Sequence, residues 1–126
     1  PVDMVGARLL PAAQREFDEA PNGIIGLETA LGLAITQLVR PGLISLPDLI
    51  YRMSTLPARL FHLPGGSLAV GAPADLAMLD PEAEWTVDPS RFFSKSRNTP
   101  FGGRRLFGRA ELTIVRGKVV YQREGA

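Results

Sequence analysis

The Gly65–Gly66 pair divides the chain into two halves with different hydrophobic periodicity, and this division constrains the fold most strongly. Before the pair, apolar residues recur at the spacing of a helix; after it, short apolar runs are bounded by turn residues. Separate blocks of helices and strands predict an α+β fold, or the junction of two domains. We therefore expect a loop-like lead-in over residues 1–22, helices over 23–65 and strands over 66–126.

Three helices are expected in the first half. A wide apolar stripe predicts a largely buried helix over residues 24–39, which ends before Pro41. Ser45 is a typical N-cap for the second helix, and Asp48 lies three residues on, where a carboxylate complements the exposed amides. A third short helix is predicted to begin between residues 54 and 57 and to run towards the glycine pair.

The second half predicts short strands. Residues 76–79 form an apolar run typical of a strand buried on both faces, and residues 84–87 form another brief candidate. Residues 112–115 and 118–121 flank Arg116-Gly117, which indicates a hairpin. So few strands would leave edges and an apolar face open, so a missing partner is expected.

Composition excludes several classes of protein. The chain of 126 residues has no cysteine, so disulfides and thiolate metal sites are excluded. Its formal net charge of +1 points to neither nucleic acid nor an anionic membrane. No signal peptide is recognised, and no apolar stretch approaches the ~20 residues that span a bilayer. We expect a cytoplasmic protein.

Catalytic residues are sparse in this sequence. His62 is the single histidine, so three hydrolytic zinc ligands are hard to assemble, and no metal ligand or cofactor is predicted for the chain. We interpret His62, at a helix end, as a capping or packing residue. A serine nucleophile is also unsupported, because Ser67 lacks the Gly-x-Ser-x-Gly context.

The segment 91–109 is basic and rich in phenylalanine, with no acidic residue. Arginine interleaved with aromatic residues is the pattern of a single-stranded nucleic-acid groove. The alternative is an extended loop whose phenylalanines anchor it to a core and whose arginines cover its outside. We favour the loop, because the rest of the chain balances the charge.

Residues 17–24 are the most suggestive for binding. Pro21 stiffens this loop, Gly23 lets a ligand approach the backbone, and a predicted helix follows at once. Backbone amides near a helix start could face a ligand carboxylate, although the same residues also suit a simple helix lead-in.

Four blocks of sequence resemble the bacterial (class I) dihydroorotases of the amidohydrolase superfamily. Residues 17–30 resemble the segment after the last metal-ligand strand of the barrel, and residues 66–76, with Asp80, resemble the return from barrel to β-sandwich. Residues 84–88 and 94–101 narrow the resemblance to dihydroorotase. The resemblance as a whole extends from residue 17 to residue 121.

This resemblance implies the terminal helices of an amidohydrolase (β/α)₈ barrel followed by an incomplete small β-sandwich. It also implies zinc in the complete enzyme, which interconverts N-carbamoyl-aspartate and dihydroorotate in pyrimidine biosynthesis. There, metal-bound hydroxide attacks the ring amide and an aspartate shuttles the proton. In the family, the backbone of a Pro-x-Gly loop contacts the substrate ring, which corresponds to Pro21, Asn22 and Gly23 here.

The chain departs from the family where the chemistry occurs. The motif Asp-His-Ala-Pro-His, expected about a dozen residues before Phe17, is absent, and Asp3 lies there without matching neighbours. We therefore assign no catalytic residue and expect no turnover and no stoichiometric metal from the isolated chain. A non-catalytic scaffold that binds aspartate carbamoyltransferase is the alternative, a homodimer is possible, and an allantoinase or hydantoinase is a weaker third hypothesis.

Overall fold

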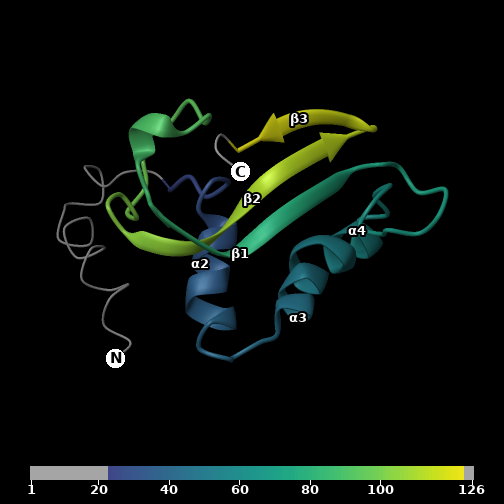
Figure 1. Ribbon diagram of the computed structural model, residues 1–126, viewed down its shortest axis with the longest axis horizontal. Helices are drawn as coiled ribbons and strands as arrows, with labels where there is room; N and C mark the ends of the chain where they lie inside the picture. The colour runs from purple at the N-terminus through teal and green to yellow at the C-terminus, as the bar shows by residue number, and fades with distance from the viewer. Residues whose placement is uncertain (1–22, 124–126) are drawn as a thin grey trace. The chain divides into compact units, whose positions relative to one another are not determined.

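The computed structural model describes residues 23–123, which form an α+β fold, as expected (Figure 1). The chain divides into two compact units, and each is built from two separate stretches of sequence. The first unit contains the described residues up to Ala30 together with Thr86–Arg105. The second contains Leu31–Trp85 and the described residues from Leu106 onward.

The first unit has a small core around Val87 and Phe92, both of which are buried. The Val87 N–H donates to the Arg104 carbonyl (2.9 Å), and its own carbonyl accepts from the Gly103 N–H (2.8 Å). These two bonds hold together the ends of the intervening segment. Within that segment, Asp88 caps the short 3₁₀ helix η3 (Pro89–Arg91) by accepting from the Ser90 N–H at 2.9 Å.

The first helix is shorter and less buried than the apolar stripe predicts. Its α-helical part, α2, spans Ala30–Ala34 and continues as a π-helical turn, η1, over Ile35–Val39. Ile35 is buried, but Leu27 is 91% exposed and lies before the helix, in a turn. The prediction of a largely buried helix over residues 24–39 was wrong, because in residues 23–123 only part of its apolar stripe is covered.

The second and third expected helices form one continuous run. It comprises α3 (Leu46–Ile50), a π-helical turn η2 (Tyr51–Thr55) and α4 (Leu56–Leu60). Ser45 is confirmed as the N-cap, since its Oγ accepts from the Asp48 N–H at 3.2 Å. α4 begins within the range predicted for the third helix, but no break separates it from α3, because the π turn pairs the Leu56 N–H with the Tyr51 carbonyl. This wider turn accommodates Pro57, which has no N–H to donate.

The sheet has three strands, β1 (Leu76–Thr86), β2 (Arg105–Val115) and β3 (Lys118–Gln122), with β2 in the middle. The two expected strands at 76–79 and 84–87 are joined in β1. Pro81 is tolerated because β1 is an edge strand, and the Asp80 carboxylate accepts from the Glu82 (2.9 Å) and Ala83 (3.2 Å) amides. The prediction that residues 76–79 form a strand buried on both faces was also wrong, since Met78 is exposed.

The hairpin between β2 and β3 is confirmed. Val115 pairs with Lys118, so Arg116 and Gly117 form a two-residue loop. Both have positive φ, 50° and 74°, as a type I′ turn requires. The Asp75 carboxylate accepts from the Arg116 N–H at 2.7 Å, which ties this turn to the residue before β1.

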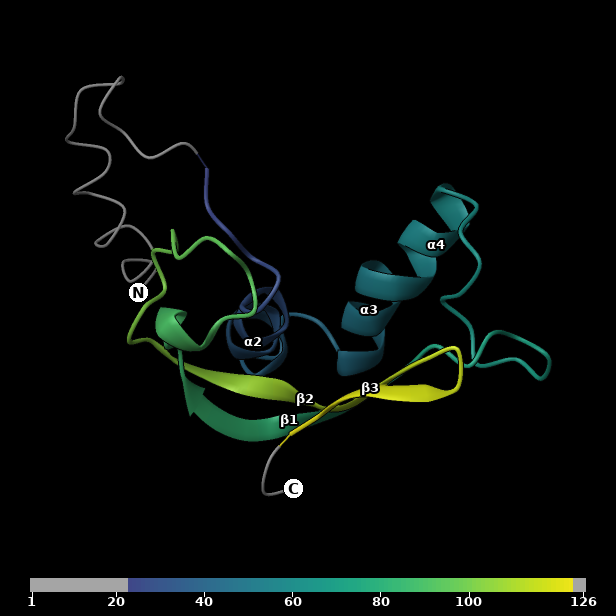
Figure 2. The ribbon, with the colours of Figure 1, turned by 90° about the horizontal axis from the view of Figure 1, so that it is seen from above.

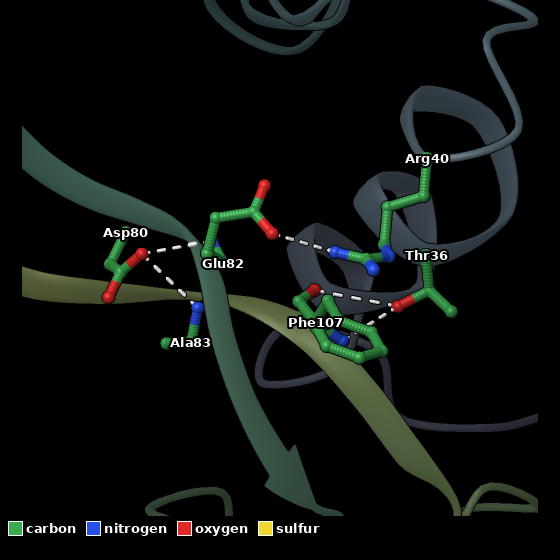
Figure 3. Close-up of polar contacts among 6 residues, drawn as sticks. All are labelled: Thr36, Arg40, Asp80, Glu82, Ala83 and Phe107. Carbon is green, nitrogen blue, oxygen red and sulfur yellow. Dashed lines mark hydrogen bonds and ion pairs between the residues drawn. The ribbon is translucent and has the colours of Figure 1, made fainter.

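Helix η1 is joined to the sheet by polar contacts within the second unit (Figure 3). The Thr36 hydroxyl accepts from the Phe107 N–H at 2.8 Å and makes a long 3.5 Å contact as donor to the Phe107 carbonyl. The Arg40 guanidinium lies 3.7 Å from the centroid of the Phe107 ring and pairs with Glu82 at 2.9 Å. The Thr36 hydroxyl thus pairs with the Phe107 N–H, a backbone group of β2 that lies outside the stretch paired with β3.

Much of the second unit's apolar surface has no cover among the described residues. Figure 2 shows both helical runs on the same side of the sheet, and within residues 23–123 no helix of this unit lies on its other face. Large apolar side chains such as Leu60, Leu63, Val119 and Val120 are more than half exposed. Exposure on this scale is typical of a surface that contacts further protein. Among the residues described, no helix is long and apolar enough to cross a bilayer.

Candidate functional site

The loop that enters the first helix includes Gly23, one of the three residues that the sequence predicts to contact substrate. Gly23 has φ +69°, and nothing lies within 4 Å of the position a Cβ would occupy. A glycine at position 23 is therefore favoured by the positive φ of the backbone, and not by a lack of space for a side chain. Further along, the N–H of the buried Thr29 (3.1 Å) and the N–H of Ala30 (2.8 Å) both donate to the Gly26 carbonyl, which closes the turn before the helix.

Residues 94–98 hold this loop within the first unit. The Ile25 N–H donates to the Asn98 carbonyl at 3.0 Å, and the Asn98 side-chain amide donates to the Gly23 carbonyl. The Ser94 N–H and hydroxyl each donate to the Glu28 carboxylate at 2.8 Å. Segments far apart in the sequence are thus brought together by backbone and side-chain hydrogen bonds.

The Glu28 carboxylate carries the electrostatic contribution to this contact. Burial is the largest single influence and raises the pKa of Glu28, but the hydrogen bonds to the carboxylate, chiefly those from the Ser94 backbone and hydroxyl, together outweigh it, so the pKa is lowered from its ordinary value of 4.5. A lowered pKa in the folded state means that the carboxylate stabilises the fold when ionised. That stabilisation is present above pH 4.5 and is lost as the pH falls through the folded-state value.

We expect this linkage to appear in a comparison with Glu28→Gln. The difference in free energy of unfolding between the parent chain and the variant should be fully present at about pH 6 and above and should shrink as the pH falls below 4.5. Urea unfolding at several pH values measures it. The pKa of Asp88 is also lowered, chiefly by the Ser90 hydroxyl, so the difference between the two proteins, not the parent curve, isolates Glu28. A gap that stays constant with pH would contradict the assignment.

Metal ligands are not gathered in the described part of the chain. Residues 23–123 contain no group of three or more His, Cys, Asp or Glu side chains that could hold a metal ion. His62 lies just after α4 with φ +52° and is exposed, so it occupies a helix-terminating position. The described residues therefore do not fit the zinc that the family resemblance implies.

The basic segment uses its charges within the protein. Arg97 donates to the carbonyls of Ser94 and Ser96, Arg104 lies 5.7 Å from the Phe101 ring centroid and Arg109 lies 5.0 Å from Trp85. The segment is also no single extended loop, because β2 begins at Arg105. These contacts engage three of the segment's arginines within the protein, and the nucleic-acid hypothesis gains no support.

A family model described as "Amidohydrolase family" matches residues 19–121. The chain belongs to the amidohydrolase family. The resemblance to dihydroorotases is also confirmed: this amidohydrolase chain is 53% identical over 111 residues to the dihydroorotase of Anaeromyxobacter dehalogenans, a match that covers 88% of the chain and 25% of that relative. It is 47% identical over 125 residues to the Brevibacillus brevis dihydroorotase, covering 96% and 29%. The chain thus spans about a quarter of the length of these curated relatives.

Solved amidohydrolase structures share the fold of this chain. L-hydantoinase (dihydropyrimidinase) from Arthrobacter aurescens is 42% identical, with a TM-score of 0.76 over 82% of this chain and 23% of that structure. D-hydantoinase (dihydropyrimidinase) from Thermus sp. is 31% identical, with a TM-score of 0.76 over 91% and 25%. The agreement extends over both units' stretches of sequence and supports the α+β architecture.

The structure places only one of the three predicted substrate-loop residues. Pro21 and Asn22 lie outside the described residues, whereas Gly23 lies at the start of the tethered loop. Sequence reasoning singled out residues 17–30 and 94–101 separately and missed that they meet. Asn98 and Gly23 are 75 residues apart, and no periodicity or local motif reports a contact at that separation.

Proposed function

We propose that this chain is the C-terminal part of a dihydroorotase-type cyclic amidohydrolase. In its complete form, the enzyme would interconvert N-carbamoyl-aspartate and dihydroorotate with exchange of one water, as a cytoplasmic step of pyrimidine synthesis. The observation that carries the proposal is the 53% identity to a curated dihydroorotase over 111 residues. The family match over residues 19–121 supports the same class of chemistry.

Within the complete enzyme, residues 23–65 would form the end of the (β/α)₈ barrel and residues 66–126 part of the small β-sandwich. The sheet face without a helix and the exposed apolar side chains of the second unit support this assignment. Both features are expected of a subdomain whose remaining surface packs on more of the same protein. The lead-in over residues 1–22 would complete the substrate loop.

The chain's own contribution to the reaction would be substrate binding. The backbone of Pro21, Asn22 and Gly23 would contact the ring of the cyclic amide, and the positive φ of Gly23 suits close approach of that backbone. Zinc, when bound by the complete enzyme, would polarise the amide carbonyl and activate the water that attacks it. Since residues 23–123 gather no metal-ligand cluster, its ligands would come from elsewhere in the enzyme.

A chimera tests this proposal directly. The matching quarter of the Anaeromyxobacter dehalogenans dihydroorotase would be replaced by this chain, and dihydroorotate formation and hydrolysis would be measured. We expect activity within about tenfold of the parent enzyme, or about 1.4 kcal/mol in activation free energy. The parent enzyme with the same quarter deleted is the control, and it should be inactive.

Other outcomes would assign the chain differently. A chimera that carries metal and hydrolyses hydantoin but not dihydroorotate would overturn the substrate and favour a hydantoinase, in line with the 42% identity to the Arthrobacter L-hydantoinase. A folded, metal-loaded chimera that turns over neither substrate would overturn the enzymatic proposal. It would favour the scaffold hypothesis, which co-purification with aspartate carbamoyltransferase and the oligomeric state of the chain would then examine.

A further inference from the structure

Asn98 contacts both peptide groups that flank Ile24. Its side-chain amide donates to the Gly23 carbonyl, and its backbone carbonyl accepts from the Ile25 N–H at 3.0 Å. One residue therefore fixes a carbonyl and an amide two residues apart on the loop. An asparagine is needed for the first of these bonds, because an aspartate of the same shape would have no N–H to donate.

Packing alone does not restrain this part of the loop. No atom lies within 4 Å of the Cβ position of Gly23 or of Gly26, and Ile24 is 58% exposed. Glycine has the largest backbone freedom of any residue, so an unrestrained Gly23 would populate several conformations. The Asn98 bonds supply the restraint that the missing side-chain contacts do not.

A second anchor joins Glu28, three residues after Ile25, to Ser94, four residues before Asn98. The Ser94 hydroxyl contacts both Glu28 carboxylate oxygens, at 2.8 and 2.9 Å, and its N–H donates to one of them. The Ser94 carbonyl in turn accepts from the Arg97 guanidinium. The loop is thus held at Gly23 to Ile25 by Asn98 and at Glu28 by Ser94, with the turn around Gly26 between these points.

We propose that Asn98 is a positioning residue for substrate binding, which presets the backbone of Gly23 for contact with a cyclic amide. This inference rests on the proposed function. When the loop is already ordered, substrate binding does not carry the entropic cost of ordering it, so the substrate binds with higher affinity. Because Asn98 acts through the loop, its removal should affect KM more than kcat.

The test combines two measurements. In the chimera, Asn98→Ala should raise KM for dihydroorotate about tenfold, equivalent to about 1.4 kcal/mol, with kcat changed by less than about threefold and metal content unchanged. Asn98→Asp should behave similarly, since it keeps the shape and loses the donor. In the 126-residue chain on its own, amide hydrogen exchange at Ile25 should be faster in the Asn98→Ala variant than in the parent sequence.

Thr99→Ala is the matched control. Thr99 adjoins Asn98, and its hydroxyl accepts from the Phe101 N–H at 3.3 Å, within its own segment. In the Thr99→Ala variant, KM for dihydroorotate and the exchange rate of the Ile25 amide should equal those of the parent. An active chimera in which Asn98→Ala leaves KM unchanged would overturn the positioning role alone. A parent chimera without activity would instead overturn the proposed function and the substrate-binding role together.

Discussion

Replacing Gly108 with alanine is expected to lower the free energy of unfolding by about 3 kcal/mol or more. Gly108 lies in β2 with φ +91°, and a Cβ there would lie 2.3 Å from Ile35 Cδ1 and 3.1 Å from Ile35 Cβ. Backbone strain and steric overlap therefore act together. Urea unfolding followed by the fluorescence of Trp85 measures the loss, since Trp85 is the single tryptophan and its indole N–H donates to the Gly108 carbonyl at 3.1 Å.

Two further variants separate the causes of this loss. Gly117 also has positive φ, +74°, but has nothing within 4 Å of its Cβ position, so Gly117→Ala should cost only about 1–2 kcal/mol of backbone strain. Ile35→Ala removes Cδ1, the atom nearest the new Cβ, together with Cγ1, so the double variant should lose less than the sum of the two single losses. Equal losses at Gly108 and Gly117 would show that packing against Ile35 is unimportant.

Thr36→Val is expected to cost about 1–3 kcal/mol, because it leaves the Phe107 N–H without the hydroxyl that accepts from it at 2.8 Å. Valine has nearly the same shape, so the loss reports the hydrogen bond shown in Figure 3 and not a cavity. Thr36→Ser keeps the hydroxyl and should cost less than Thr36→Val. The same denaturation assay applies, and a serine variant as unstable as the valine variant would refute the role of the hydroxyl.

Local chemistry made parts of the fold predictable from sequence. Ser45 with Asp48 indicated a helix start, and Arg116-Gly117 indicated the hairpin; both were confirmed. These signals are reliable because the residues that carry them make the contacts themselves. Pro57 and Pro81 are residue types that usually interrupt a helix or a strand, but each is accommodated here, by a π turn in one case and by an edge strand with an Asp80 cap in the other.

The candidate site was predictable only in pieces. Gly23 was singled out through the resemblance of its segment to a family loop, and its positive φ agrees with the need for glycine there. The partner segment also carried a family resemblance, but nothing in the residues 94–98 identifies Glu28 or Gly23 as their partners. Such pairings depend on the path of the chain through the fold, which hydrophobic periodicity does not encode.

The separation of 75 residues between Gly23 and Asn98 also sets an order of events during synthesis. At the usual rates of translation, Asn98 would leave the ribosome about 4 to 15 seconds after Gly23. Helix contacts within a few residues form in about a microsecond once the chain is free, so the first helices can sample their conformation long before this partner exists. The loop would therefore mature late, and a slow or paused ribosome would leave it accessible to proteases for longer than the helices that follow it.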